Sequence, residues 1–562
     1  MSQSVCALEN PLESSLLDKY LGCILGMAVG DAYGTTFEFI PRHGISDHDL
    51  TDELVGGGKF RLMKGMFTDD TSMALLQAEC LLSRRKEEET NTNDDHSHEI
   101  TTSSKETSST VPSLFEQELE NFPIEFQLNT MKDEEQNGSK ISKWIEFLIH
   151  GEPRHTLLDG RQIQNKFLEW YHEGHLSASG DCFDIGKTIL VHLLKNEKTQ
   201  AAFCPVESWN DQASGNGALM RLAPVPLYYY RLCEKALLRE DDKNSKQVLR
   251  EKFLHRVITE SGISAFTTHP SQLAFDCNRY MAALMIGCMQ GVTKEELFKN
   301  SYQHEEEACD SYLFVPHGLP RNYWQQFPLR KEVREMIQNF KSKSADEISN
   351  SGYAVTAFEA ALWSFASTDT YFEGLKKIVR LGDDADTVAC IYGQLAGCFY
   401  GVKGIPEPLI SQLVLKDLLK IIATELYYSG GADIAVKNDH KEEMNSHVIY
   451  KNVMSLYYNL ENSYKGIHRR SNPCPKQFKT IEEFDLAVSQ MIQEFEKHQQ
   501  EILQNLEKTD ERLKCQPLKD SILSISNSIL QDFKTRCDCF TKPPLLDRLN
   551  RFSGPPSRPF IK

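Results

Sequence analysis

The sequence of 562 residues lacks the features that would assign it to several common classes of protein. It contains no run of about 18 consecutive apolar residues, so it encodes no conventional transmembrane helix. The G-x-x-x-x-G-K-[ST], G-x-G-x-x-G, G-x-S-x-G and H-E-x-x-H motifs are all absent. These absences argue against phosphotransfer, Rossmann redox chemistry and serine hydrolysis.

The 15 cysteines include no C-x-x-C pair, and Cys537 and Cys539 are too close together for ordinary zinc-ligand spacing. Most of the others lie in apolar stretches, where cysteine behaves as a small apolar residue. We therefore expect reduced, structural thiols. The first 15 residues lack the charged and apolar regions of a signal peptide, so the predicted compartment is the cytoplasm, with the nucleus left open.

Basic residues are in the minority, with 62 Lys and Arg against 80 Asp and Glu and a net charge of −18. This balance disfavours nucleic acid as a partner, because a nucleic-acid surface is usually broadly basic. It still allows an anionic ligand that is held locally by metal ions or helix termini. The hydrophobic content of 40% is sufficient for a large core.

Signals for β-strands are scarce, whereas apolar residues recur at helical spacing, so we expect an all-α fold. The predicted catalytic domain covers residues 15–435. Residues 86–140 are expected to be a largely disordered insertion, because Ile100 is the only large apolar residue between positions 85 and 110. Residues 303–350 read as a second insertion. Residues 440–562 are expected to form a helical C-terminal extension with a loose, Pro-rich end.

Two patterns within these regions predict helix packing. In the C-terminal extension, an amphipathic stripe of Phe484, Val488, Met491, Ile492 and Phe495 indicates either a short coiled coil or a helix packed on the core. In the catalytic domain, two predicted helices each carry a face of small residues that would let their backbones approach closely: Gly22, Gly26 and Gly30 on one, and Ala389, Gly393, Ala396 and Gly397 on the other.

Four motifs rich in Asp, Asn and Gly begin or end predicted helices. They are Gly30-Asp31-Ala32-Tyr33-Gly34 with Glu38 beyond it, Thr68-Asp69-Asp70-Thr71, Ser214-Gly215-Asn216-Gly217, and Gly382-Asp383-Asp384-Ala385-Asp386-Thr387. Each Asp pair alone is explained by helix capping. If the two helix starts meet, however, four carboxylates converge, and such a set of hard oxygen ligands suits Mg²⁺ or Mn²⁺.

Six segments occur in an order that resembles the ADP-ribosylglycohydrolase family, which includes dinitrogenase-reductase-activating glycohydrolases and ADP-ribosyl-acceptor hydrolases. They are GDAYG followed by Glu38, FTDDTS, GDCFDIGKT, SGNGALMRLAPVPL, TTHPS and LGDDADTVACIYGQLAGCFYG, and they span residues 17–405. The resemblance implies a compact, orthogonal multi-helix domain and a magnesium-dependent hydrolase that releases ADP-ribose from a modified acceptor.

The resemblance also implies roles for individual residues. The expected ligands of two Mg²⁺ ions, with Mn²⁺ as the alternative, are Thr68, Asp69, Asp70, Asp384, Asp386 and Thr387. The expected substrate-binding residues are Ser214, Gly215, Asn216, Gly217 and His269. Glu38 and Asp184 are the candidates for proton transfer. The chain departs from the pattern of many relatives at GDDADT, where Asp383 replaces Gly and Ala385 replaces Thr.

The sequence does not determine the acceptor, which is expected to be an ADP-ribosylated protein or a small molecule. The enzyme itself is expected to act as a monomer. The sequence leaves two alternatives to this function open. One is a non-catalytic ADP-ribose-binding scaffold, against which the intact Asp pairs and Glu38 count. The other is a hydrolase of the same fold that acts on O-acetyl-ADP-ribose or on ADP-ribosylated nucleic acid, which needs little basic surface if one nucleotide is flipped out.

Overall fold

The computed structural model describes residues 11–94, 156–205, 210–238, 240–299, 312–428, 439–471, 481–509 and 516–541. Within these ranges the structure is helical and contains isolated β-bridges in place of strands, so the predicted all-α fold is confirmed. None of the helices in these ranges combines the length and hydropathy needed to cross a membrane. The ten cysteines whose side chains are described are all free thiols, as expected.

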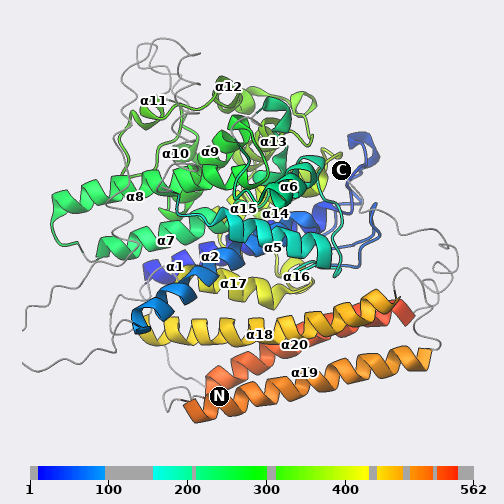
Figure 1. The fold of residues 1–562 in the computed structure, drawn as a ribbon. Coiled ribbons are helices and arrows are strands. Elements are labelled where there is room, and N and C mark those ends of the chain that lie inside the picture. The colour runs from blue at the N-terminus through cyan, green and yellow to red at the C-terminus, as the bar shows by residue number, and fades with distance from the viewer. Residues whose placement is uncertain are drawn as a thin grey trace, which may run out of the picture.

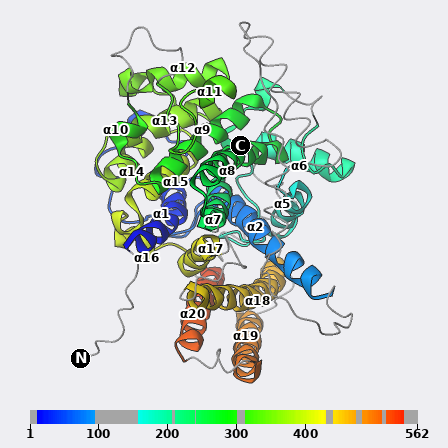
Figure 2. The same cartoon turned by 90° about the vertical axis from the view of Figure 1, so that its left-hand side faces the viewer.

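The helices fall into a large compact body and a layer of three long helices beside it (Figures 1 and 2). The α-helices of the body are α1 (Pro11–Gly34), α2 (Asp69–Asp94), α5 (Gly160–Glu173), α6 (Lys187–Thr199), α7 (Pro224–Leu238), α8 (Lys243–Ile263), α9 (Gln272–Met289), α10 (Lys294–Leu297), α11 (Tyr323–Gln326), α12 (Lys331–Asn339), α13 (Ala354–Ala366), α14 (Tyr371–Val379), α15 (Ala385–Tyr400), α16 (Glu407–Ser411) and α17 (Lys416–Tyr428). The layer is α18 (Asp439–Ser471), α19 (Ile481–Thr509) and α20 (Gln516–Thr541).

Short 3-10 helices connect many of these elements. They are η1 (Arg42–Gly44), η3 (Asp211–Ala213), η4 (Asn216–Ala218), η5 (Ser264–Thr267), η6 (Phe340–Ser342), η7 (Ala345–Glu347) and η8 (Val402–Gly404). Side-chain caps fix the starts of several α-helices, because they satisfy N–H groups that have no partner within the helix. Asp159 caps α5, Asp242 caps α8, Ser271 caps α9 and Thr370 caps α14.

Helices α1 and α15 form the centre of the body and lie side by side. Residues 385–398 of α15 are all buried, which is typical of a helix enclosed by others. Helix α15 also packs against α9, α13 and α14, and α1 packs against α17. The pair therefore fixes the positions of helices on both of its sides.

The close approach of α1 and α15 depends on glycine. A Cβ atom added to Gly393 would lie 2.1 Å from the carbonyl oxygen of Gly26, and one added to Gly30 would lie 2.1 Å from that of Ala389. The same holds at the ends of the contact, where Gly22 faces Gly397 and Gly34 faces Asp386. The predicted meeting of the two small-residue faces is confirmed.

The predicted insertions and the C-terminal end are described only in part. Helix α2 extends to Asp94, so the first residues of the expected disordered insertion are helical; residues 95–155 lie outside the described ranges, as does the Pro-rich end from residue 542. In the expected second insertion, residues 312–350 form short helices that pack on the body. There the buried Trp324 donates its indole N–H to the carbonyl oxygen of Phe314, at 2.7 Å.

The three long helices pack against one another and meet the body mainly along α17 (Figure 1). The stripe predicted on α19 supplies Met491 and Phe495, which are buried against this layer. Helix α19 packs mainly against α18 and α20, so the stripe lies within the three-helix layer and not directly on the body, where the second interpretation placed it. Aromatic side chains of α18 and α20 also meet, with the rings of Tyr464 and Phe533 5.1 Å apart.

A buried ionic network joins α18 to the body. His175, in the loop after α5, lies 2.8 Å from Glu461 of α18 through Nδ1 and 2.9 Å from Glu79 of α2 through Nε2. Both ring nitrogens face carboxylates, which requires the doubly protonated, cationic ring. Burial opposes this charge, but the hydrogen bonds and charges of Glu461 and Glu79 outweigh burial and raise the pKa of His175 to about 9. His175 lowers the pKa of Glu461 to about 2 against the effect of burial.

The α1–α15 contact predicts a large effect of one methyl group. Gly393→Ala should lower the midpoint of thermal unfolding strongly, because the added Cβ meets backbone on the facing helix and overpacking of this kind costs about 3 kcal/mol. Gly291→Ala is the matched control. Its Cβ would have open space and a backbone φ of 78°, for which we expect a loss of about 1 kcal/mol. Equal shifts for the two variants would contradict the proposed role of the contact.

The His175 network predicts a pH-dependent part of the stability. Because the folded pKa of His175 is raised from 6.5 to about 9, its contribution is fully present below pH 6.5 and is lost as the pH rises through 9. The difference in unfolding midpoint between the wild-type chain and His175→Gln should therefore be constant from pH 5 to 6.5 and should shrink toward pH 9.5. A difference that grows over that upper interval would show that the imidazolium charge does not stabilise the contact.

Candidate functional site

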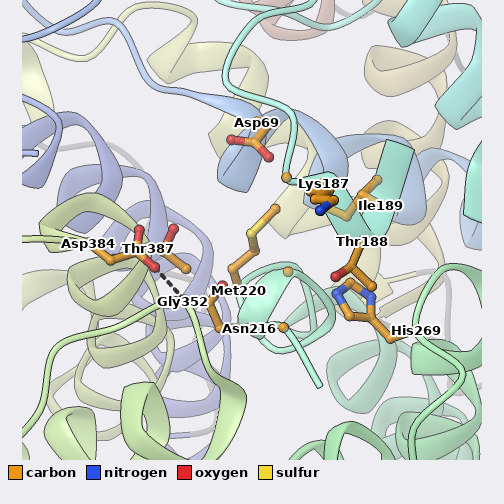
Figure 3. A pocket seen from close by; sticks show the side chains of 13 residues that line it. Asp69, Lys187, Thr188, Ile189, Asn216, Met220, His269, Gly352, Asp384 and Thr387 are labelled. Carbon is orange, nitrogen blue, oxygen red and sulfur yellow. Dashed lines mark hydrogen bonds between the residues drawn. The ribbon is translucent and has the colours of Figure 1, made fainter. Parts of the chain in front are cut away.

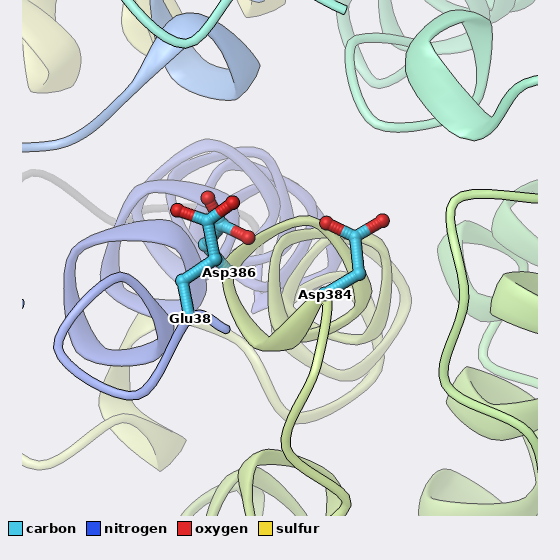
Figure 4. Close-up of side chains that lie close together, drawn as sticks. All are labelled: Glu38, Asp384 and Asp386. Atoms are coloured by element: carbon cyan, nitrogen blue, oxygen red, sulfur yellow. The ribbon is translucent and has the colours of Figure 1, made fainter. Parts of the chain in front are cut away.

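Three acidic side chains converge where α1 ends and α15 begins (Figure 4). Oxygen atoms of Glu38, Asp384 and Asp386 all lie within 4.8 Å of one another, and we call these residues the acidic cluster. Glu38 and Asp386 are buried, and Asp384 is partly exposed. Because Asp386 is in the first turn of α15 and Asp384 is its N-cap, the positive end of the helix dipole favours their ionised forms.

Backbone hydrogen bonds hold Glu38 beside the start of α15. Phe39 donates its N–H to the carbonyl oxygen of Asp383 at 2.7 Å, and Asp383 donates to the carbonyl oxygen of Ile40 at 2.9 Å. Asp383 has a φ of 52°, in the left-handed region that glycine adopts freely and that Asp tolerates only moderately. The side chain of Asp383 is exposed and lies outside the acidic cluster.

The start of α2 is tied to the same place by Asp31 of α1. The Asp31 carboxylate accepts hydrogen bonds from the backbone N–H and the hydroxyl groups of Thr68 and Thr71, at 2.7–3.1 Å. Burial and the neighbouring Asp386 raise the pKa of Asp31 well above its usual range. Asp31 thus anchors the Thr68-Asp69-Asp70-Thr71 motif to the acidic cluster, a structural role that the sequence analysis did not assign to it.

The two helix starts meet through Asp70. Its Oδ2 lies 2.9 Å from the hydroxyl oxygen of Thr68 and 3.5 Å from that of Thr387. Asp69, next to it in the first turn of α2, lines the same cavity as Asp384 and Thr387. All six residues expected as metal ligands therefore lie at the junction of α2 and α15.

The residues at this junction have the chemistry of a divalent-cation site. The donor atoms are carboxylate and hydroxyl oxygens, which Mg²⁺ and Mn²⁺ prefer. The 4.8 Å limit on the separations in the acidic cluster is comparable to the distance across one coordination sphere, about 4.2 Å for Mg²⁺. The residues present therefore fit such a group.

A cavity of about 210 Å³ extends from the junction (Figure 3). Asp69, Asp384 and Thr387 line one end, and the segments Gly186–Ile189 and Gly215–Gly217, with Met220, His269 and Gly352, line the rest. Asn216 donates a hydrogen bond from its side-chain amide to Oδ2 of Asp384 at 2.7 Å. The cavity and the acidic cluster are thus joined through Asp384.

Two glycines allow the cavity wall to form against His269. A Cβ atom at Gly215 would lie 3.2 Å from Nε2 of His269, and one at Gly217 would lie 2.7 Å from Ile189. The hydroxyl of Thr268 is 2.8 Å from Nδ1 of His269. Burial and the nearby Arg221 hold the pKa of His269 well below its usual range, so the ring is neutral.

Buried polar contacts hold the Gly215–Gly217 turn from beneath. The guanidinium of Arg221 donates to the carbonyl oxygen of Gly217 and to the hydroxyl of Thr268. On its other side, Asn216 donates its backbone N–H to the carbonyl oxygen of Gly352 at 2.9 Å. The turn is therefore fixed before any ligand binds, which lowers the entropy lost on binding.

The predicted substrate and proton-transfer residues are distributed unevenly. Gly215, Asn216, Gly217 and His269 line the cavity, whereas Ser214 shares a hydrogen bond of 2.6 Å with Ser271, the N-cap of α9. Asp184 is fully buried at a φ of 59° and lies outside both the acidic cluster and the lining of the cavity. Glu38 belongs to the acidic cluster.

Sequence reasoning missed the start of α6 as part of the cavity wall. Gly186 is the N-cap of this helix, and Lys187 and Thr188 form its first turn on the cavity side. The signal was present: Gly186-Lys187-Thr188 directly precedes an apolar helical stretch, a pattern that leaves N–H groups without partners in the helix. The segment GDCFDIGKT contributes to the family resemblance and contains Asp184, but the sequence alone assigned no role to its last three residues.

Comparisons with known proteins identify the family to which the chain belongs. The sequence model of the family described as ADP-ribosylglycohydrolase matches residues 12–136 and 143–433. The ADP-ribosylarginine hydrolase Tri1 of Serratia proteamaculans is 27% identical over 419 residues, which cover 74% of this chain and 81% of that protein. The ADP-ribosyl-[dinitrogen reductase] glycohydrolase of Rhodospirillum rubrum is 22% identical over 407 residues, which cover 72% and 92%.

Similarities extend to an animal protein over a smaller part of the chain, and to a solved structure. The human ADP-ribosylhydrolase ARH3 is 25% identical over 244 residues, which cover 40% of this chain and 61% of that protein. A solved chain titled "ADP-ribosylglycohydrolase-related protein complex" aligns with a TM-score of 0.46 and 24% identity, over 74% of this chain and all of that chain. Because the family model matches most of the chain, the chain belongs to the ADP-ribosylglycohydrolase family and is an enzyme.

Proposed function

We propose that this enzyme hydrolyses the glycosidic bond between ADP-ribose and an acceptor, with the help of two divalent cations, magnesium by preference and manganese as the alternative. The observation that carries the proposal is the continuity of the acidic cluster with the cavity through Asp384. One end of this site has the ligands for cations, and the other has groups suited to a diphosphate and a ribose. An ADP-ribosyl substrate matches this order, because its diphosphate is followed by the ribose whose anomeric carbon carries the acceptor.

The diphosphate is assigned to the cavity wall made by α6 and the Gly215–Gly217 turn. The backbone N–H groups at the start of α6 have no partners within the helix, and the helix dipole favours an anion there. The glycine turn exposes further backbone N–H groups. The neutral His269 can exchange hydrogen bonds with ribose hydroxyls without adding a charge.

The cations are assigned to the junction of α2 and α15. Asp69, Asp70, Asp384 and Asp386 would hold them together with the hydroxyls of Thr68 and Thr387. Such cations would orient the ribose hydroxyls and would increase the acidity of a water molecule. Asn216 keeps Asp384 oriented through its 2.7 Å hydrogen bond.

Glu38 is the candidate for moving protons, because its carboxylate belongs to the acidic cluster and is buried. In the reaction, the oxygen of a water molecule forms a bond to the anomeric carbon of the ribose, the bond from that carbon to the acceptor breaks, and the acceptor receives a proton. Asp184 remains the second candidate, and its complete burial makes a positioning role the simpler one for it.

The proposed acceptor is an arginine side chain. This choice is supported by the printed names of two relatives, the ADP-ribosylarginine hydrolases Tri1 of Serratia proteamaculans and Pseudomonas putida, each 27% identical to this chain. A protein substrate is further supported by the relative that acts on dinitrogen reductase. The acidic net charge of −18 again disfavours ADP-ribosylated nucleic acid.

We expect Asp386→Asn to leave the protein folded, to weaken Mg²⁺ binding in calorimetric titration and to lower the release of ADP-ribose roughly 100-fold or more. Removing one carboxylate charge lowers the attraction for the cation and distorts the acidic cluster. Asp485→Asn, at an exposed position on α19, removes the same charge and should leave both quantities unchanged. Unchanged activity of the Asp386 variant would refute the metal assignment.

A panel of substrates tests the reaction itself. We expect release of ADP-ribose from an arginine-linked peptide, its loss after treatment with EDTA, and its recovery on addition of Mg²⁺ or Mn²⁺. Serine-linked peptide, O-acetyl-ADP-ribose and an ADP-ribosylated oligonucleotide complete the panel. Tight binding of ADP-ribose without turnover of any substrate would favour the scaffold alternative, and turnover that survives EDTA would exclude the metal requirement.

A further inference from the structure

Three phenylalanine side chains from separate segments form a continuous apolar surface, which we call the aromatic strip. The ring centroids of Phe39 and Phe60 are 6.4 Å apart at an interplanar angle of 67°, and those of Phe60 and Phe183 are 5.4 Å apart at 58°. Phe39 is 51% exposed, and the other two rings are half-buried. The strip therefore presents aromatic surface to solvent.

The aromatic strip adjoins the acidic cluster but is separate from the cavity. Phe39 directly follows Glu38, a member of the cluster, and none of the three rings lines the cavity. The cavity reaches the cluster through Asp384. Suppose that the diphosphate of a substrate lies in the cavity and its anomeric carbon lies at the cluster. The acceptor would then extend from the cavity on the side of Glu38 and Phe39.

The backbone at Phe39 is held in an unfavourable conformation. Its φ of 62° lies in the left-handed region, which a bulky residue rarely adopts. The hydrogen bond to Asp383 and the bridge between Pro41 and Gly382 impose this conformation. Asparagine would adopt this φ more easily than phenylalanine does. Burial does not explain the presence of an aromatic side chain here, because half of it is exposed to solvent. Strain of this kind is concentrated at functional sites.

The aromatic strip suits a planar cation. The ammonium of Lys59 already lies 5.7 Å from the centroid of Phe39, which shows that a cation can approach this ring. Lys59 is exposed, so its flexible side chain can move aside. A guanidinium stacks on aromatic faces and is attracted by the carboxylates of the neighbouring cluster.

We propose that Phe39, Phe60 and Phe183 form the acceptor subsite of this enzyme, where the guanidinium of an ADP-ribosylated arginine lies against the rings. The inference rests on the proposed function and adds to it the residues that determine acceptor specificity. The strip acts on the acceptor half of the substrate and makes no contribution to the binding of ADP-ribose itself.

The test compares substrate kinetics with the binding of free ADP-ribose. Phe39→Asn removes the ring and keeps the backbone conformation, and Phe183→Leu removes a ring at a second position while keeping apolar volume. For an arginine-linked peptide, each variant should raise KM about fivefold to tenfold, the range expected when a stacked cation loses an aromatic partner, with kcat changed less than about twofold. The Kd for free ADP-ribose, measured by calorimetry, should stay as in the wild type.

Leu486→Ala is the control, because it removes an exposed apolar side chain on α19 without touching the aromatic strip, and it should change neither KM nor Kd. An unchanged KM in both Phe variants would overturn the proposal. A rise in the Kd for free ADP-ribose as large as the rise in KM would also overturn it. Wild-type turnover of a serine-linked but not of an arginine-linked peptide would overturn the guanidinium assignment together with the proposed arginine acceptor, and would leave the proposed hydrolysis of an ADP-ribosyl bond intact. Failure of the wild-type enzyme on every linkage would instead refute the proposed function.

Discussion

The site depends on the backbone contact between α1 and α15. Glycines on both helices remove the side chains that would otherwise keep the two axes apart, and carbonyl oxygens occupy the space that Cβ atoms would need. Because the contact runs from Gly22 to Gly34, it fixes the end of α1 against the start of α15. Asp31 and Asp386 are brought together in this way, and the remaining acidic residues are positioned from that point.

Two loops complete what the helix contact begins. The segment after α1 pairs with the residues before α15 through the bridge between Pro41 and Gly382, which places Glu38 in the acidic cluster. The segment before α13 pairs in the same manner with the Gly215–Gly217 turn, through the bridge between Gly215 and Tyr353. Unusual backbone angles at Phe39, Asp184 and Asp383 accompany this assembly. The loops thus bring Glu38 and the Gly215–Gly217 turn to the helix starts that carry Asp69 and Asp386.

Much of this arrangement could be predicted from the sequence, because its causes are local. Helical periodicity gave the all-α fold, and the spacing of small residues gave the α1–α15 contact. The role of Asp31 as an anchor for α2 could not be predicted, because it depends on hydrogen bonds to residues 37–40 positions away. The same limit applies to His175, whose partners Glu79 and Glu461 are distant in the sequence. It also applies to Ser214, whose hydroxyl is hydrogen-bonded to that of Ser271, the N-cap of α9.

The electrostatics of the junction favour cations over protons as the means of balancing its negative charge. Burial and mutual repulsion raise the pKa values of such carboxylates, as they do for Asp31. The N-terminal ends of α2 and α15 act in the opposite direction, because Asp69, Asp70 and Asp386 lie in first turns, where the helix dipole stabilises the ionised form. A positive partner of high charge density would stabilise the ionised form of carboxylates at such short separations. The two divalent cations of the proposed function would meet this requirement, and a substrate whose ribose hydroxyls reach them would be oriented by the same positive charge.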